Sequence, residues 1–275
     1  MRVEHYQSIL NTFQGTEAGR SLQNIFRWST FRNGESDQLW SEALGATAND
    51  FTHGQLMYGI ARSFLRHEPD RFTTEQQQTF LNGVICHDWG EAIINGNGVG
   101  DVSAQTKTDM VEKEESVIAR LAINALNLPS ATKLQLLTGY VDVVEGLDPQ
   151  LHHAFKALEK SEYVITTMKL YQNCRRMNQN GRMGIDQEIP MIGRVLVIDL
   201  GKVLDLYAPT YLRSLGVLFY TAAPLIDEMF AYVHPWLLES KEWGGKPVDH
   251  ATLAKNFSAK WSAFKAGFPF LAPKS

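Results

Sequence analysis

Apolar residues recur at helical spacing along almost the whole chain, and this pattern limits the fold more than any other feature of the sequence. The segment after His53 is a clear case, because its apolar residues repeat every three or four positions: Leu56, Met57, Ile60, Ala61, Phe64 and Leu65. The same pattern predicts helices over 75–94 and 106–128, and a long helix over 151–176. The β-branched run "RVLVI" would also suit a short strand, but no partner strand is evident. We therefore predict an all-α fold.

The best internal boundary is the segment "NQNGRMGIDQEIP", which is polar, rich in glycine and ends in a proline. More apolar segments of helical character follow it, and they share no repeat with the first part of the chain. We predict one domain over 1–185 and a helical extension over 186–275 that packs on it.

Composition and charge exclude several classes of protein. The net charge of -4 lacks the basic excess that a nucleic-acid polymer as partner would require. Cys86 and Cys174 are too few for a disulfide framework, which favours a reduced, cytoplasmic setting. The uncharged stretch 214–226 contains a proline and falls short of the roughly 20 residues of a membrane helix. The first ten residues lack the long apolar core of a secretory signal. We expect no membrane partner.

The segment "VICHDWGEAI" places His87, Asp88 and Glu91 in an otherwise apolar run. Imidazole nitrogen and carboxylate oxygen together suit a transition-metal ion such as Zn, Mn, Fe or Co. Glu91 lies one helical turn from the pair, where a carboxylate can act as general acid or base beside an ion. A His-Asp pair is common by chance, however, so a metal site needs further ligands.

His53, just before its amphipathic helix, is the next candidate ligand, although a histidine there is more often a cap or a surface residue. A fourth ligand would come from a later helix, which offers several choices: Asp142, Glu145, His152, His153, Glu159 and Glu162. Spacing alone does not choose among them. Glu159 lies between Lys156 and Lys160, so a solvated helix face explains it equally well.

The stretch "FRWSTFRN" interleaves arginines with aromatic residues near the N-terminus. Arg27 could contact a phosphate, and Trp28 could stack on a base or sugar. Such a cluster more often serves only in packing or in surface pairing of charges and rings. The glycine-rich loop "GNGVGDVSAQTK" lacks the order of a P-loop, so we exclude a Walker-type phosphate site there.

Taken in order, these features resemble the HD-domain metal-dependent phosphohydrolases, and most closely the branch that contains bacterial 5'-deoxynucleotidases. The resemblance covers roughly 27–170 and rests on the matching residues Arg27-Trp28, His53, "HDWGE", Gly100-Asp101, Lys107, the acidic "EKEE" and "KALEKSE" at 156–162. Two departures stand out. Glu159 replaces the family's final aspartate ligand, and "NGESDQLWSEALGATAND" looks like an insertion before His53.

The resemblance implies an HD-domain helical bundle with a C-terminal helical extension. It implies one divalent metal ion (Mn, Co, Zn, Fe or Mg) held by four ligands: His53, His87, Asp88 and Glu159. Asp142 or His153 would substitute if Glu159 does not reach. Glu91 and Asp101 would be catalytic, and Arg27, Trp28 and Lys107 would bind the substrate. Family members often form dimers, so a homodimer is expected.

The implied activity is release of phosphate from (deoxy)nucleoside 5'-monophosphates. An HD site does not determine where a phosphate chain is cut, so hydrolysis of a nucleoside triphosphate or of another phosphate ester is the second hypothesis. A catalytically degenerate helical binding protein is the third, because the change from Asp to Glu at position 159 could weaken the site.

Overall fold

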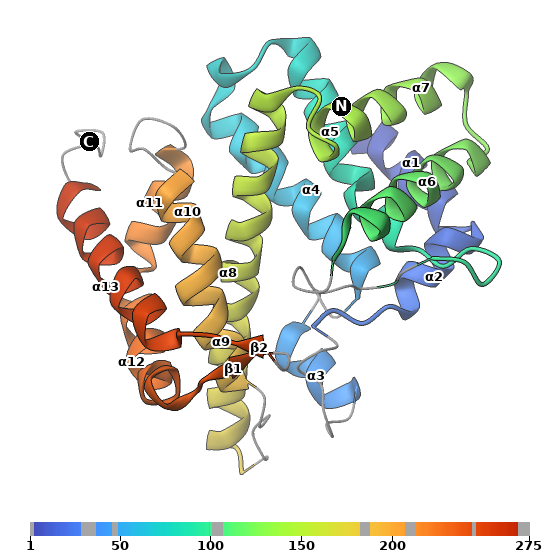
Figure 1. Cartoon of the computed structure of the whole chain (residues 1–275). Helices are drawn as coiled ribbons and strands as arrows, with labels where there is room; N and C mark the ends of the chain where they lie inside the picture. The colour runs from blue at the N-terminus through green and yellow to red at the C-terminus, as the bar shows by residue number, and fades with distance from the viewer. Residues whose placement is uncertain are drawn as a thin grey trace. The chain divides into compact units, whose positions relative to one another are not determined.

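The computed structural model describes residues 3–28, 37–45, 49–98, 100, 107–181, 188–206, 213–243 and 246–268. It confirms the all-α class, with helices throughout and one short antiparallel pair of two-residue strands (Figure 1). The chain divides into two compact units, Met1–Thr30 with Ala46–Leu158 and Phe31–Gly45 with Glu159–Ser275. The domain boundary predicted at 185/186 lies outside the described residues, so that boundary stays a prediction.

The first unit contains helices from the N-terminal half of the chain. In order they are α1 (Val3–Gln14), α2 (Glu17–Asn24), α4 (Asp50–His67), η3 (Pro69–Arg71), α5 (Thr74–Cys86), η4 (His87–Glu91), α6 (Asp109–Ala125), α7 (Ser130–Gly139), η5 (Tyr140–Val144) and the first part of α8 (Pro149–Gln179). Helix α5 packs against α4, α7 and η5 and is the centre of this unit. Its buried end, which includes Phe80, Val84 and Ile85, leads directly into the "HDWGE" segment.

The second unit contains α3 (Asp37–Leu44), the remainder of α8, α9 (Glu188–Arg194), η6 (Val195–Leu200), α10 (Gly201–Leu206), α11 (Arg213–Thr221), α12 (Ala223–Glu239), β1 (Glu242–Trp243), β2 (Lys246–Pro247) and α13 (His250–Gly267). Helix α12 packs against α9 and α13 around buried side chains that include Met229 and Phe257. The strand alternative for "RVLVI" is wrong, because Val195–Leu200 form a π-helix whose apolar side chains pack inside this unit. Among the described residues, no helix is both long and apolar enough to cross a membrane.

Helices α5 and α7 approach each other at two glycines. A Cβ atom at Gly83 would lie 2.4 Å from the carbonyl oxygen of Gly139 and 2.4 Å from Cβ of Val143. A Cβ atom at Gly139 would in turn lie 2.6 Å from the backbone nitrogen of Gly83. Such separations are too short for real atoms, so both positions require glycine for the backbones to pack at this distance.

Gly83→Ala is therefore expected to lower the free energy of unfolding by about 1–3 kcal/mol, the usual cost of overpacking a rigid contact. Gly59→Ala is the matched control, because Gly59 is also helical and a Cβ atom there meets nothing within 4 Å. That control should be stabilised by about 0.5–1 kcal/mol, since alanine has the higher helix propensity. Urea denaturation of both variants measures the difference, and an equal response would contradict the close approach.

Candidate metal centre

Two elements of the first unit position the clustered histidines. His53 lies in the first turn of α4, and His87 begins η4 at the end of α5. The start of α4 is set by Asn49, whose side chain accepts a hydrogen bond from the Thr52 N–H at 2.9 Å. His53 thus lies within its helix, where the sequence suggested a position just before it. Because α4 packs against α5, the two imidazoles meet across the helix pair.

The "HDWGE" segment is a 3-10 helix, and the predicted continuous α-helix over 75–94 is wrong beyond Cys86. Cys86 leaves the α-helical conformation with φ -106° and ψ 12°, and the tighter winding begins at His87. A 3-10 helix has three residues per turn, so residues three apart lie on one face. The change of winding therefore keeps Asp88 and Glu91 on a common face.

The donor atoms of His53, His87 and Asp88 converge on one point. The His53 Nε2 and His87 Nε2 atoms are 3.2 Å apart. The His87 Nε2 atom lies 3.1 Å from Asp88 Oδ1, and the His53 Nε2 atom lies 3.4 Å from Asp88 Oδ2. Two ligand atoms that each lie about 2.1 Å from one ion, at bond angles of about 90–110°, are about 3.0–3.4 Å apart. The three separations fall in this range, with one Asp88 oxygen facing each histidine, so the group could hold a metal ion.

The hydrogen bond of His87 supports the same interpretation. Its Nδ1 atom lies 2.7 Å from the Val84 carbonyl oxygen, which can only accept, so Nδ1–H is the donor. In a neutral ring the Nε2 lone pair then faces His53 and Asp88. A backbone carbonyl that orients a histidine in this way is the usual support of a metal ligand. Two imidazole nitrogens this close also require a proton or a cation between them.

Two further carboxylates, those of Asp50 and Glu91, lie close to Asp88. Oxygens of Asp50, Asp88 and Glu91 form a second group within 4.8 Å of one another, and Arg27 forms ion pairs with Asp50 and Asp88. With neutral histidines and ionised carboxylates, these described side chains would carry a net negative charge in a largely buried place. Burying such charge uncompensated is costly. A divalent cation would balance it, so the residues present fit a divalent metal ion.

Asp88 is ionised in this environment. Its burial alone would raise the pKa of the carboxyl group. When His87 and His53 are protonated, their positive charges, the hydrogen bond from His87 and the charge of Arg27 together hold that pKa far below its usual range, and a bound cation would act in place of the two protons. An ionised carboxylate with two histidine nitrogens is a donor set typical of zinc, manganese, iron and cobalt sites.

Arg27 and Trp28 are brought to the cluster by a backbone connection to the start of α4. Phe26 and Asn49 form an antiparallel bridge, and the Asp50 N–H donates to the Ile25 carbonyl oxygen at 3.1 Å. Trp28 has a φ of 62°, in the left-handed region that non-glycine residues seldom adopt. The guanidinium of Arg27 lies 5.8 Å from the centre of the Trp28 ring. The structure therefore brings the "RW" segment and His53 to one site.

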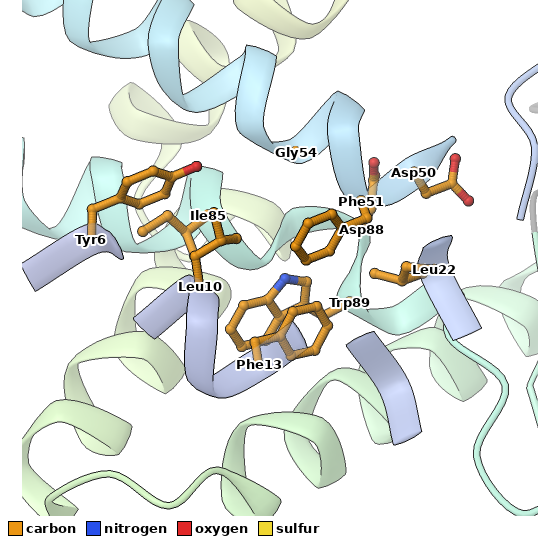
Figure 2. A pocket seen from close by; sticks show the side chains of 10 residues that line it. All are labelled: Tyr6, Leu10, Phe13, Leu22, Asp50, Phe51, Gly54, Ile85, Asp88 and Trp89. Atoms are coloured by element: carbon orange, nitrogen blue, oxygen red, sulfur yellow. The ribbon is translucent and has the colours of Figure 1, made fainter. Parts of the chain in front are cut away.

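A small cavity lies beside the cluster (Figure 2). Asp50 and Asp88 are the charged residues that line it, and the stacked rings of Phe13 and Trp89, 3.8 Å apart, form part of its apolar wall. Its volume of about 10 Å³ suits about one water molecule and is far below that of a ligand pocket. This cavity is thus a buried flank of the cluster, and an organic substrate would have to bind elsewhere.

Helix α6 packs against η4, the segment that carries His87 and Asp88. A Cβ atom at Gly90 would lie 2.5 Å from the Glu115 carbonyl oxygen, which explains the glycine within "HDWGE". The buried Glu115 carboxylate pairs with Lys107, with Oε2 2.5 Å from Nζ. Burial raises the pKa of Glu115, Lys107 opposes this shift, and the negative charge of Asp88 adds to it. Lys107 is therefore paired with Glu115, and the charge of Glu115 in turn interacts with that of Asp88.

The remaining predicted residues have separate positions. Asp101 lies outside the described residues. Asp142 lies in η5, and neither it nor His153 belongs to a described group that could hold a metal ion. Glu159 belongs to the second unit. Its negative charge lies near Asp199 and adds to the rise in the pKa of Asp199 that burial mainly causes. The assignment of Glu159 as fourth ligand stays a prediction.

Two residues beside the cluster were not singled out from the sequence. Asp50 is fully buried one turn before His53, and this i, i+3 spacing in "NDFTH" was the available signal. Glu115 is one of three glutamates in "EKEE", and nothing in the sequence distinguishes it from its exposed neighbours.

No protein-family model, curated protein or solved structure matches this chain. A functional assignment therefore depends on the residues of the cluster and their chemistry.

Proposed function

We propose that the chain is a metal-dependent phosphohydrolase of the HD type that releases phosphate from (deoxy)nucleoside 5'-monophosphates. The observation that carries this proposal is the convergence of His53, His87 and ionised Asp88 on one point with donor separations of 3.1–3.4 Å. A divalent ion bound there would act as a Lewis acid towards a phosphoryl oxygen.

The cluster's own residues supply the rest of the chemistry. Arg27 carries the positive charge beside the carboxylates and would balance the charge that develops on the phosphoryl oxygens. Glu91 shares a face with Asp88 and would take a proton from the attacking water or give one to the leaving oxygen. Trp28, next to Arg27 in the chain, would pack on the sugar or base. Lys107 and Asp101 would complete the contacts to phosphate and sugar.

The fourth metal ligand would be Glu159, through an arm one methylene longer than the aspartate of the resembling family. The substrate would be a small phosphate ester, with no nucleic-acid polymer or membrane involved. The chemistry of the cluster alone does not determine which phosphate bond is cut, so nucleoside triphosphates and other esters belong in the substrate test.

The proposal is tested with a panel of nucleotides and separate additions of Mn²⁺, Co²⁺, Mg²⁺ and Zn²⁺. Nucleoside 5'-monophosphates are expected to release inorganic phosphate in a metal-dependent way, and chelation should abolish the release. Release of pyrophosphate or triphosphate from nucleoside triphosphates would move the proposal to the second hypothesis. Metal-loaded protein that hydrolyses no ester in the panel would favour a binding protein, and protein that binds none of the four ions would overturn the metal centre.

A further inference from the structure

Arg27 lies at similar distances from two carboxylates. Its NH1 atom is 3.7 Å from Asp50 Oδ1 and 3.8 Å from Asp88 Oδ2. All three side chains are largely buried, and that of Asp50 is fully so. The two distances are nearly equal, and each is longer than the 2.7–2.9 Å typical of a direct charge-assisted hydrogen bond. The guanidinium is thus shared between the two carboxylates.

This sharing matters because both oxygens of Asp88 face the histidines. Oδ1 lies against His87 Nε2, and Oδ2 lies against His53 Nε2. A guanidinium that has one carboxylate partner prefers to bind both of its oxygens in a planar, two-pronged contact. If Arg27 closed on Asp88 in that way, it would occupy the oxygens that a metal ion needs.

Asp50 is well placed to prevent that closure. Its backbone N–H donates to the Ile25 carbonyl oxygen, and Asn49 before it forms a bridge with Phe26. The chain segments that carry Arg27 and Asp50 are therefore joined to each other. Asp50 also begins α4, where the helix dipole favours a negatively charged side chain.

We propose that Asp50 is a positioning residue that holds the guanidinium of Arg27 away from Asp88, so that Asp88 remains available as a metal ligand. This inference rests on the metal centre of the proposed function and adds to it a specific role for a residue outside the ligand set. Asp50 acts through Arg27, so removal of the Asp50 carboxylate should weaken metal binding mainly when Arg27 is present.

A double-mutant cycle on metal affinity tests this dependence. Titration calorimetry with Mn²⁺, and with Zn²⁺ in competition with a chelator, would compare wild type, Asp50→Asn, Arg27→Gln and the double variant. Arg27→Gln should bind metal at least as tightly as wild type. Asp50→Asn should weaken binding, and the factor should be about tenfold larger with Arg27 present than in the Arg27→Gln background. Asp50→Glu should recover most of the loss.

An equal weakening in both backgrounds would overturn the proposal, because Asp50 would then act only through its own charge. If Arg27→Gln does not fold, Arg27→Lys replaces it in the cycle, since an ammonium group cannot form the two-pronged contact. These titrations do not depend on hydrolysis. Wild-type protein that binds neither metal ion overturns the proposed function and this inference together, whereas wild-type binding with an additive cycle overturns this inference alone.

Discussion

Asp88→Asn is expected to remove metal binding from the cluster and, with it, all hydrolysis. The substitution keeps the shape of the side chain but replaces an ionised ligand by a neutral amide, and it leaves Arg27 and the two histidines without their shared carboxylate. Even residues that only support a ligand typically change metal affinity by about 10–100-fold, so loss of a charged ligand should exceed about 100-fold. Elemental analysis after dialysis, and phosphate release at saturating metal, measure the two effects.

Asp70→Asn is the matched control for Asp88→Asn. It makes the same chemical change at an exposed position in η3 of the same unit. Its metal content and turnover should equal those of wild type. His87→Ala should behave like Asp88→Asn, since it removes the ring that the Val84 carbonyl orients. Full metal content and full activity in Asp88→Asn would show that the metal centre is assigned wrongly.

The all-α class could be predicted because it depends on local periodicity. Residues such as Met57, Phe64 and Leu65 on α4 repeat with the helical period, and the structure buries all three. The pairing of His53 with His87 could be proposed from the ligand chemistry of the residues and from the resemblance, but not from spacing. A metal ligand set on separate helices leaves no local pattern that identifies it.

The local details of the site could not be predicted, because they depend on contacts between distant segments. The change from α-helix to 3-10 helix at Cys86 coincides with the close approach of α6 at Gly90. Asp50 lies in a stretch that looked like an insertion, and its role appears only once the bridge between Phe26 and Asn49 is known. The same bridge explains how Arg27 reaches Asp50, in the first turn of the helix that carries His53.

Pairing also changes the interpretation of individual charged residues. Lys107 was predicted as a phosphate contact, and the structure places its ammonium on Glu115. Arg27 was also predicted as a phosphate contact, and its guanidinium forms ion pairs with both Asp50 and Asp88. Sequence spacing gives no account of such partners, because each ion pair joins separate elements. Any phosphate that binds these cations would have to compete with carboxylates that are already in place.

Glu91→Gln is the second substitution with a large expected effect, and it separates catalysis from metal binding. Glu91 lies outside the His53–His87–Asp88 group but within 4.8 Å of the Asp50 and Asp88 carboxylates, on the same face of η4 as Asp88. Glutamine keeps the size of the side chain and removes its ability to exchange a proton. Turnover should fall by about 10²–10⁴-fold, the usual contribution of a general acid or base. The metal content at saturating metal should not change.

The comparison of kcat with KM identifies the step that Glu91 affects. A residue that acts only in proton transfer lowers kcat and leaves the KM for the nucleotide nearly constant. Glu114→Gln is the control, because it makes the same change on the exposed face of α6. Wild-type turnover in Glu91→Gln would remove the acid-base role. Loss of metal together with turnover would instead make Glu91 a ligand, and the group formed by Asp50, Asp88 and Glu91 would then be the true metal centre.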